Sequence, residues 1–117
     1  MVAIVDDDEL IRQALERLMR LAGFTAQSFA SAEEFLHSGV LNETGCLISD
    51  IRMPGMSGID LQKRLKEENE RIPIIFITAH GDAQMCLQAL RDGAVEFLSK
   101  PFNEDDLLKT IRAALES

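Results

Sequence analysis

The chain has 117 residues, of which 46% are apolar and 27% are charged. This length suits one domain that buries a core without metal or disulfide support, and the composition excludes a disordered chain. Lys and Arg number 12 against 20 Asp and Glu, so the formal charge is -8. Clustered cations are needed to bind nucleic acid or an anionic membrane, so the acidic balance argues against both kinds of partner.

The sequence also carries no pattern of membrane insertion or export. Its longest apolar runs, such as residues 74–77, fall far short of the ~20 residues that span a bilayer, and no basic segment followed by an apolar one opens the chain. Cys46 and Cys86 are predicted to be buried apolar side chains in a reducing compartment, with a disulfide left open as the alternative. We therefore expect a cytoplasmic protein.

Short apolar runs predict five β-strands. Four of the five runs contain Val or Ile, which favour strands, and the runs are residues 2–5, 24–29, 46–49, 73–78 and 95–99. Segments of helical period separate them. Ile11, Leu15 and Leu18 share one face of the first such segment, which Gly23 ends, and residues 108–115 repeat the spacing.

Helix starts are marked by residues that cap them. Three pairs place a capping oxygen three residues before a carboxylate, namely Ser31 with Glu34, Ser57 with Asp60, and Asn103 with Asp106. Asp8 is predicted to cap the first helix, and Asp82 to cap a helix over residues 83–92 that Gly93 ends. These signals agree with the strand assignment, which strengthens both.

Strands that alternate with helices predict a parallel sheet covered on both faces, because each crossover helix must lie across the sheet. We therefore expect residues 1–117 to form one doubly wound α/β domain with five strands and five helices. In such sheets the functional site lies beyond the carboxyl ends of the strands, where strand order reverses.

Polar side chains follow the predicted strands at these ends. The first strand runs into Asp6-Asp7-Asp8, the third into Asp50, the fourth ends at Thr78, and Lys100 follows the fifth. Crowded carboxylates repel unless a cation neutralises them. Carboxylates and water suit Mg²⁺, whereas zinc prefers His and Cys ligands. A carboxylate beside Mg²⁺ can attack a phosphoryl group and become an aspartyl phosphate.

These motifs resemble a known family over the whole chain. Asp6-Asp7, the segment from Asp50 to Gly58, Thr78-Ala79 and Lys100-Pro101-Phe102 are together similar to the receiver domain of bacterial response regulators, the CheY-like superfamily. Residues 77–82 and 93–97 are similar to its FixJ-type subset. The resemblance implies the flavodoxin-like strand order 2-1-3-4-5. Members of this subset usually carry a helix-turn-helix output domain after the receiver, so we expect the chain to be a fragment of a larger regulator, with a stand-alone receiver left open as the alternative.

The resemblance also implies a role for each site residue. Asp50 would be the phosphoacceptor, and Lys100, with an expected cis bond to Pro101, would pair with a phosphate oxygen. Thr78 and Phe97 would be the switch residues. The cofactor would be Mg²⁺, with Mn²⁺ as a possible substitute, and the implied ligands are Asp7 and Asp50 directly, Asp6 through water, and the Arg52 main-chain carbonyl.

Residues near the rim have less specific predictions. Ala79 is small and would leave access to the phosphoryl group, and Arg52 and His80 would tune hydrolysis, although each also fits a solvated loop. Pro54-Gly55 favours a tight turn after Asp50, and Gly58 allows a helix to begin close to the sheet.

The function implied is a phosphorylation-dependent switch rather than an enzyme acting on other substrates. A sensor histidine kinase would phosphorylate Asp50, and the altered surface of helix 4, strand 5 and helix 5 would act on an output domain or effector, or form a homodimer. Only the domain's own phosphorylation and dephosphorylation chemistry is expected.

Three other functions fit these residues less well. A small-molecule phosphatase usually has a second carboxylate two residues after the nucleophile, where Arg52 stands here. A flavin module would need a phosphate-binding loop in place of three aspartates. A degenerate receiver that only binds proteins would not need the full set of site residues.

Overall fold

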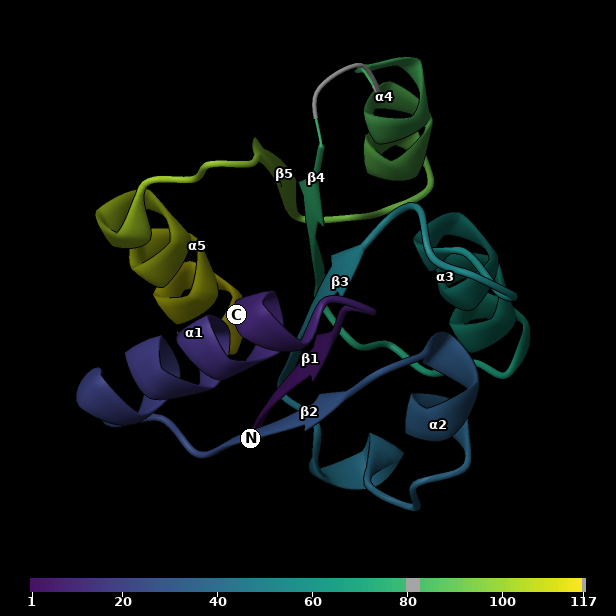
Figure 1. Ribbon diagram of the computed structural model, residues 1–117. Coiled ribbons are helices and arrows are strands. Elements are labelled where there is room, and N and C mark those ends of the chain that lie inside the picture. The colour runs from purple at the N-terminus through teal and green to yellow at the C-terminus, as the bar shows by residue number, and fades with distance from the viewer. Residues whose placement is uncertain (80–82, 117) are drawn as a thin grey trace.

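Five parallel strands form one sheet in the order β2-β1-β3-β4-β5, which confirms the predicted fold class (Figure 1). The computed structural model describes residues 1–79 and 83–116. The strands are β1 (Val2–Val5), β2 (Ala26–Phe29), β3 (Cys46–Asp50), β4 (Ile74–Thr78) and β5 (Glu96–Ser99). The helices are α1 (Glu9–Leu21), α2 (Ala32–Leu36), α3 (Gly58–Glu67), α4 (Ala83–Arg91) and α5 (Glu104–Glu116), with a short 3₁₀ helix at Leu41–Glu43.

The helices cover the two faces of the sheet unequally. Figure 1 shows α1 and α5 on one side and α2, α3 and α4 on the other. Successive residues of β1 supply the two cores, because side chains alternate along a strand. Ala3 and Val5 pack with Phe35 and other residues of α2, α3 and α4, whereas Val2 and Ile4 pack with residues of α1 and α5.

Burial along the strands follows their place in the sheet. Every residue of β1 and β4 is buried, and so are the first four of β3. The edge strands β2 and β5 are only partly buried. Central parallel strands therefore appear in the sequence as mostly apolar runs, and Asp50 stands out as the charged residue that ends one of them.

The predicted helix caps are present wherever the structure describes them. Asp8 accepts hydrogen bonds from the Leu10 and Ile11 amides. The Ser31 and Asn103 side chains accept from the third residue beyond, and Ser57 with Asp60 forms a reciprocal capping box. Asp82 lies outside the described residues.

Gly58 begins α3 very close to the sheet, as predicted. A Cβ atom there would collide with the Asp50 main-chain oxygen and would lie 2.9 Å from the Phe76 ring. The Gly58 amide also donates to the Ile51 carbonyl at 2.8 Å. The absence of a side chain thus lets α3 approach the end of β3.

Some element boundaries differ from those predicted. The second strand begins at Ala26 rather than at residue 24, because the Phe24 amide donates to the Met19 carbonyl and completes the end of α1. The third strand extends one residue further, to Asp50. Helix α4 ends one residue earlier than predicted, and the 3₁₀ helix was not predicted.

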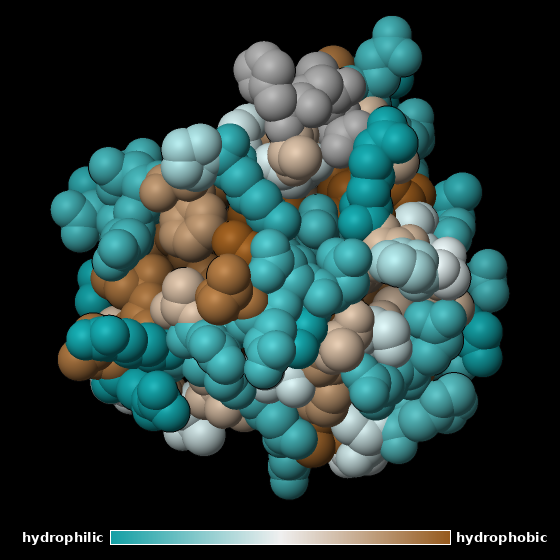
Figure 2. Space-filling model, viewed as in Figure 1, coloured by the Kyte–Doolittle hydropathy of each residue, from teal (hydrophilic) through white to brown (hydrophobic). Residues whose placement is uncertain are grey.

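Figure 2 shows apolar surface gathered over α1 and α5. A pocket of about 360 Å³ lies there, with Leu18, Leu21 and Phe102 among its lining residues. Within the described residues, no helix has the length and apolar character to cross a membrane. Cys46 and Cys86 are buried in the clusters on opposite faces of the sheet, and no disulfide joins them.

Candidate functional site

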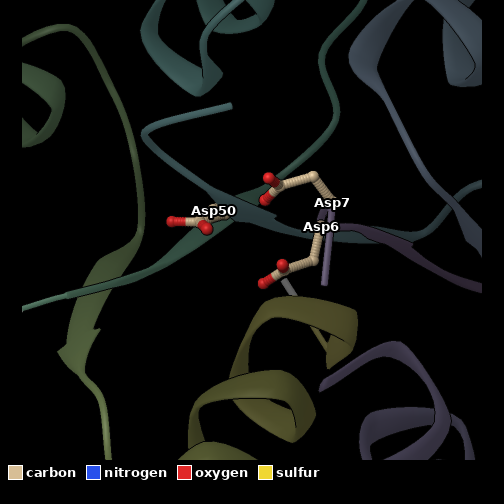
Figure 3. A group of neighbouring side chains, drawn as sticks. All are labelled: Asp6, Asp7 and Asp50. Atoms are coloured by element: carbon tan, nitrogen blue, oxygen red, sulfur yellow. The ribbon is translucent and has the colours of Figure 1, made fainter. Parts of the chain in front are cut away.

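Three carboxylates meet where β1 and β3 end (Figure 3). The two strands are neighbours, and Val5 pairs with Ser49, so Asp6 and Asp50 follow at the same level. Asp7 comes next along the chain. Each of the three side chains offers an oxygen, and these oxygens lie within 4.8 Å of one another. The predicted convergence of distant acidic residues is therefore present.

Asp6 is the most buried of the three, at 2% exposure. Its Oδ1 atom accepts a hydrogen bond from the Asp8 amide at 2.9 Å, and its Oδ2 atom lies 3.1 Å from Lys100 Nζ. The Arg12 guanidinium donates to the Asp6 main-chain oxygen at 2.7 Å. The turn from β1 into α1 is thus held before any ligand arrives.

Asp50 has one carboxylate oxygen on a backbone donor and the other on a cation. Oδ1 accepts from the Ile51 amide at 2.7 Å, and Oδ2 lies 3.2 Å from Lys100 Nζ. Burial raises the pKa of Asp50 and the Asp6 charge adds to this, while Lys100 and the Ile51 amide act in the opposite direction without cancelling it. The surroundings thus disfavour the charged form of Asp50, and a further cation near this carboxylate would offset that cost.

Lys100 brings its charge to the site from the end of β5. Burial alone would lower the pKa of its ammonium, but the hydrogen bonds and charges of Asp6 and Asp50 outweigh burial and raise it. The Lys100 amide donates to the Thr78 carbonyl at 2.8 Å. The Lys100-Pro101 peptide bond is cis, as predicted.

The two predicted switch residues lie on neighbouring strands. Thr78 is 3% exposed at the end of β4, and its hydroxyl donates to the Ala79 carbonyl at 3.3 Å. Phe97 on β5 pairs with Phe76 on β4 and packs, half-buried, against the core cluster of α2, α3 and α4. Thr78 thus lies at the site end of β4, and Phe97 lies on the face of the sheet that α4 covers.

The rim residues are exposed where they are described. Arg52 and Ala79 are exposed in the loops that follow β3 and β4. His80 lies outside the described residues. The contact of Arg12 with the site was not predicted from the sequence. The available signal was its position, one turn into the helix that follows the acidic end of β1.

The donor set fits a hard divalent cation. Carboxylate oxygens suit Mg²⁺ or Mn²⁺, and the cluster contains no His or Cys ligand that would favour zinc. Asp7 is exposed, Asp50 is half-buried and Asp6 is buried, so the group opens to solvent on one side. Such an arrangement leaves room for water and phosphate oxygens on the same cation.

A family model described as the response regulator receiver domain matches residues 2–112. The chain belongs to this family. Response regulator protein TodT of Pseudomonas putida is 50% identical over 115 residues, which are 98% of this chain and 51% of TodT. Nodulation protein W of Bradyrhizobium diazoefficiens is 47% identical over the same share of this chain and 51% of its own length. The chain thus spans about half the length of these relatives.

Solved structures agree with the family and the fold. Response regulator StyR superposes with a TM-score of 0.92 at 49% identity, covering 98% of this chain and 58% of StyR. The crystal structure of FixJ-N superposes with a TM-score of 0.89 at 39% identity, covering 98% of this chain and 92% of FixJ-N. Relatives also include the C4-dicarboxylate transport transcriptional regulatory protein DctD of Rhizobium meliloti, 44% identical over 98% of this chain and 25% of DctD. The predicted membership of the response regulator receiver family is confirmed.

Proposed function

We propose that Asp50 is the phosphoacceptor of this receiver domain and that a sensor histidine kinase is its donor. The contact of Lys100 with both Asp50 and Asp6, beside three converging carboxylates, carries this proposal. Asp7 and Asp50 would hold Mg²⁺ or Mn²⁺ directly, Asp6 through water, and Arg52 through its main-chain carbonyl. The bound cation supplies positive charge that offsets the charge of the transferring group.

The transfer needs few groups from the protein. An oxygen of Asp50 forms a bond to phosphorus while the bond to the donor's imidazole nitrogen breaks, and the electron pair of that bond stays on the nitrogen. The nucleophile is an ionised carboxylate and requires no base. Lys100 is already within 3.2 Å of Asp50 and would stabilise the charge on the phosphoryl oxygens.

Phosphorylation would be communicated through Thr78 and Phe97. A phosphoryl group on Asp50 gives the Thr78 hydroxyl a charged acceptor that is stronger than the Ala79 carbonyl. Movement of Thr78 towards the phosphate would open space for Phe97 to turn inward, and two conformations would exchange populations. Ala79, Arg52 and His80 would adjust the lifetime of the phosphorylated state from the rim.

The surface that responds is proposed to be the α4–β5–α5 face. Leu87 on α4 and Val95 just before β5 are 53% and 42% exposed, so this face offers apolar contacts to a partner. It would act on an output domain or on a separate effector protein, or it would form a homodimer on activation. We propose that this takes place in the cytoplasm. Light scattering with and without beryllofluoride tests the dimer, and an unchanged mass at high concentration contradicts it.

A small-molecule phosphatase is disfavoured by the loop after β3. Residue 52 is an exposed arginine, where that mechanism requires a carboxylate. A degenerate receiver is disfavoured because the Lys100 and carboxylate contacts are all formed.

Incubation with acetyl phosphate and Mg²⁺ followed by intact-mass measurement tests the function. The wild type is expected to gain one phosphoryl group only when Mg²⁺ is present. Asp50→Asn should gain none, whereas Asp105→Asn makes the same change at an exposed site on α5 and should behave as wild type. Equal adducts on Asp50→Asn and wild type would overturn the assignment of the nucleophile.

A further inference from the structure

Glu33 on α2 reaches across to the turn between β3 and α3, residues 51–57. Its Oε2 atom accepts a hydrogen bond from the Met56 amide at 3.3 Å, although the two residues are 23 positions apart. Its Oε1 atom is buried and has no hydrogen-bond partner among the described residues. Burial of an unpaired carboxylate oxygen is unfavourable. A contribution to folding stability is therefore a weak explanation for a glutamate at position 33.

Gly55 makes room for the approach. Its φ angle is +76°, and a Cβ atom there would lie 2.6 Å from Glu33 Oε2. Any other residue would have to push the carboxylate away and would also adopt a left-handed backbone. The turn and the Glu33 carboxylate therefore fit each other closely.

The turn that Glu33 supports follows the site directly. It begins after Asp50, and the Gly58 amide closes it on the Ile51 carbonyl at 2.8 Å. Glu33 adds a second attachment at Met56, between these ends. Arg52, whose main-chain carbonyl is proposed to face the cation, lies within the same turn.

We propose that Glu33 is a positioning residue of the site: its carboxylate holds the β3–α3 turn in the conformation that presents the Arg52 carbonyl to a divalent cation. The inference rests on the proposed function, because that function assigns the cation and the carbonyl ligand. Glu33 is not among the residues proposed to hold the cation, and it acts through the Met56 amide. Groups that orient metal ligands in this way commonly change metal affinity when they are removed.

The variants separate positioning from general stability. Glu33→Ala removes the acceptor, and Glu33→Asp keeps the charge but shortens its reach. Glu33→Gln retains an oxygen that can accept from Met56. The matched control is Glu34→Ala on the same helix, because Glu34 Oε2 accepts from the Ala30 amide at 2.8 Å, whereas the Met56 amide donates to Glu33.

Two measurements read the effect without relying on phosphorylation. Amide hydrogen exchange at Met56 in the metal-free protein reports whether the turn is held, and calorimetric titration with MgCl₂ gives the Mg²⁺ affinity. Glu33→Ala and Glu33→Asp should expose the Met56 amide to faster exchange and weaken Mg²⁺ binding by about tenfold, the low end for groups that orient metal ligands. Glu33→Gln should stay within about twofold of wild type, since its hydrogen bond remains.

The controls decide between the outcomes. Glu34→Ala should bind Mg²⁺ as wild type does, even where its urea midpoint falls as far as that of Glu33→Ala. Wild-type affinity in Glu33→Ala, or equal weakening in Glu34→Ala, overturns the inference while the proposed function stands. A wild-type protein that binds no Mg²⁺ overturns the proposed function and this inference with it.

Discussion

Lys100 Nζ lies 3.2 Å from Asp50 Oδ2, and the two residues come from strands that are not neighbours. Lys100 follows β5 and Asp50 ends β3, so the lysine side chain extends over the end of β4. The same ammonium lies 3.1 Å from Asp6 at the end of β1. One cation therefore connects the carboxyl ends of three strands before any metal or phosphate is bound.

Removal of this ammonium should slow phosphorylation while the fold is kept. Lys100→Met keeps the aliphatic chain and loses the charge, so phosphorylation by acetyl phosphate is expected to be about a hundredfold slower. The metal-free protein should also be less stable, because Asp6 and Asp50 then repel each other without a shared cation. Lys63→Met, at an exposed position on α3, is the control. Equal rates in both variants would exclude a role for Lys100 in the transfer.

Asp50 should make the metal-free fold less stable at neutral pH. Burial raises its folded-state pKa above the value of 3.8 expected in the unfolded chain. The folded state thus binds the proton more tightly, and stability is lost as pH rises from 3.8 through the folded pKa. Asp50→Asn carries no charge at this position. In EDTA, its free energy of unfolding, measured with urea, is expected to exceed that of wild type, and the difference should be larger at pH 7 than at pH 4. A gap that shrinks towards pH 7 would mean that the Asp50 charge does not destabilise the metal-free fold.

Magnesium should stabilise the folded protein through Asp7. A cation that binds only the folded state at a concentration of 100 times Kd adds about 2.7 kcal/mol to the free energy of unfolding. Asp7→Asn is expected to lose most of this gain, measured by urea titration with and without Mg²⁺. Asp8→Asn is the matched control, because Asn also caps helices and Asp8 serves as the cap of α1. Loss of the Mg²⁺ effect in Asp8→Asn alone would argue for a different metal site.

The close start of α3 predicts unequal costs for two glycine substitutions. Gly58→Ala sets a methyl group against the Asp50 backbone and should cost about 1–3 kcal/mol of stability. A Cβ atom at Gly45 would lie 2.8 Å from the end of the Leu115 side chain, which can rotate away, and at ordinary contact distance, 3.8 Å, from the Met1 main-chain oxygen. Gly45→Ala should cost less than about 1 kcal/mol. Urea unfolding compares them, and similar costs would mean that the backbone approach at Gly58 is unimportant.

The helix caps, and the residues that meet at the carboxyl edge of the sheet, could be predicted from the sequence. Ser57 with Asp60 marks a helix start through neighbouring atoms, and the capping box is present. Asp6 and Asp50 could be placed together because parallel strands end at a common edge of the sheet. The roles of the site residues came from the family resemblance, and the membership that it indicated is confirmed.

Contacts that depend on side-chain reach between distant elements could not be predicted. The hydrogen bond of Glu33 to Met56 joins α2 to a turn 23 residues away, and no period or motif links the two positions. The Arg12 contact with the Asp6 carbonyl depends on how α1 lies against β1. The start of β2 depends on the Phe24 amide, which completes α1 instead of joining the sheet.

Locating the phosphoryl group on the chain identifies the phosphoacceptor directly. Borohydride reduces an aspartyl phosphate to homoserine, so the protein phosphorylated with acetyl phosphate and Mg²⁺ is reduced, digested and sequenced by tandem mass spectrometry. We expect homoserine at position 50, with Asp6 and Asp7 unchanged. Homoserine at position 6 or 7, or none in a protein whose intact mass shows the adduct, would contradict the assignment of Asp50 as the phosphoacceptor.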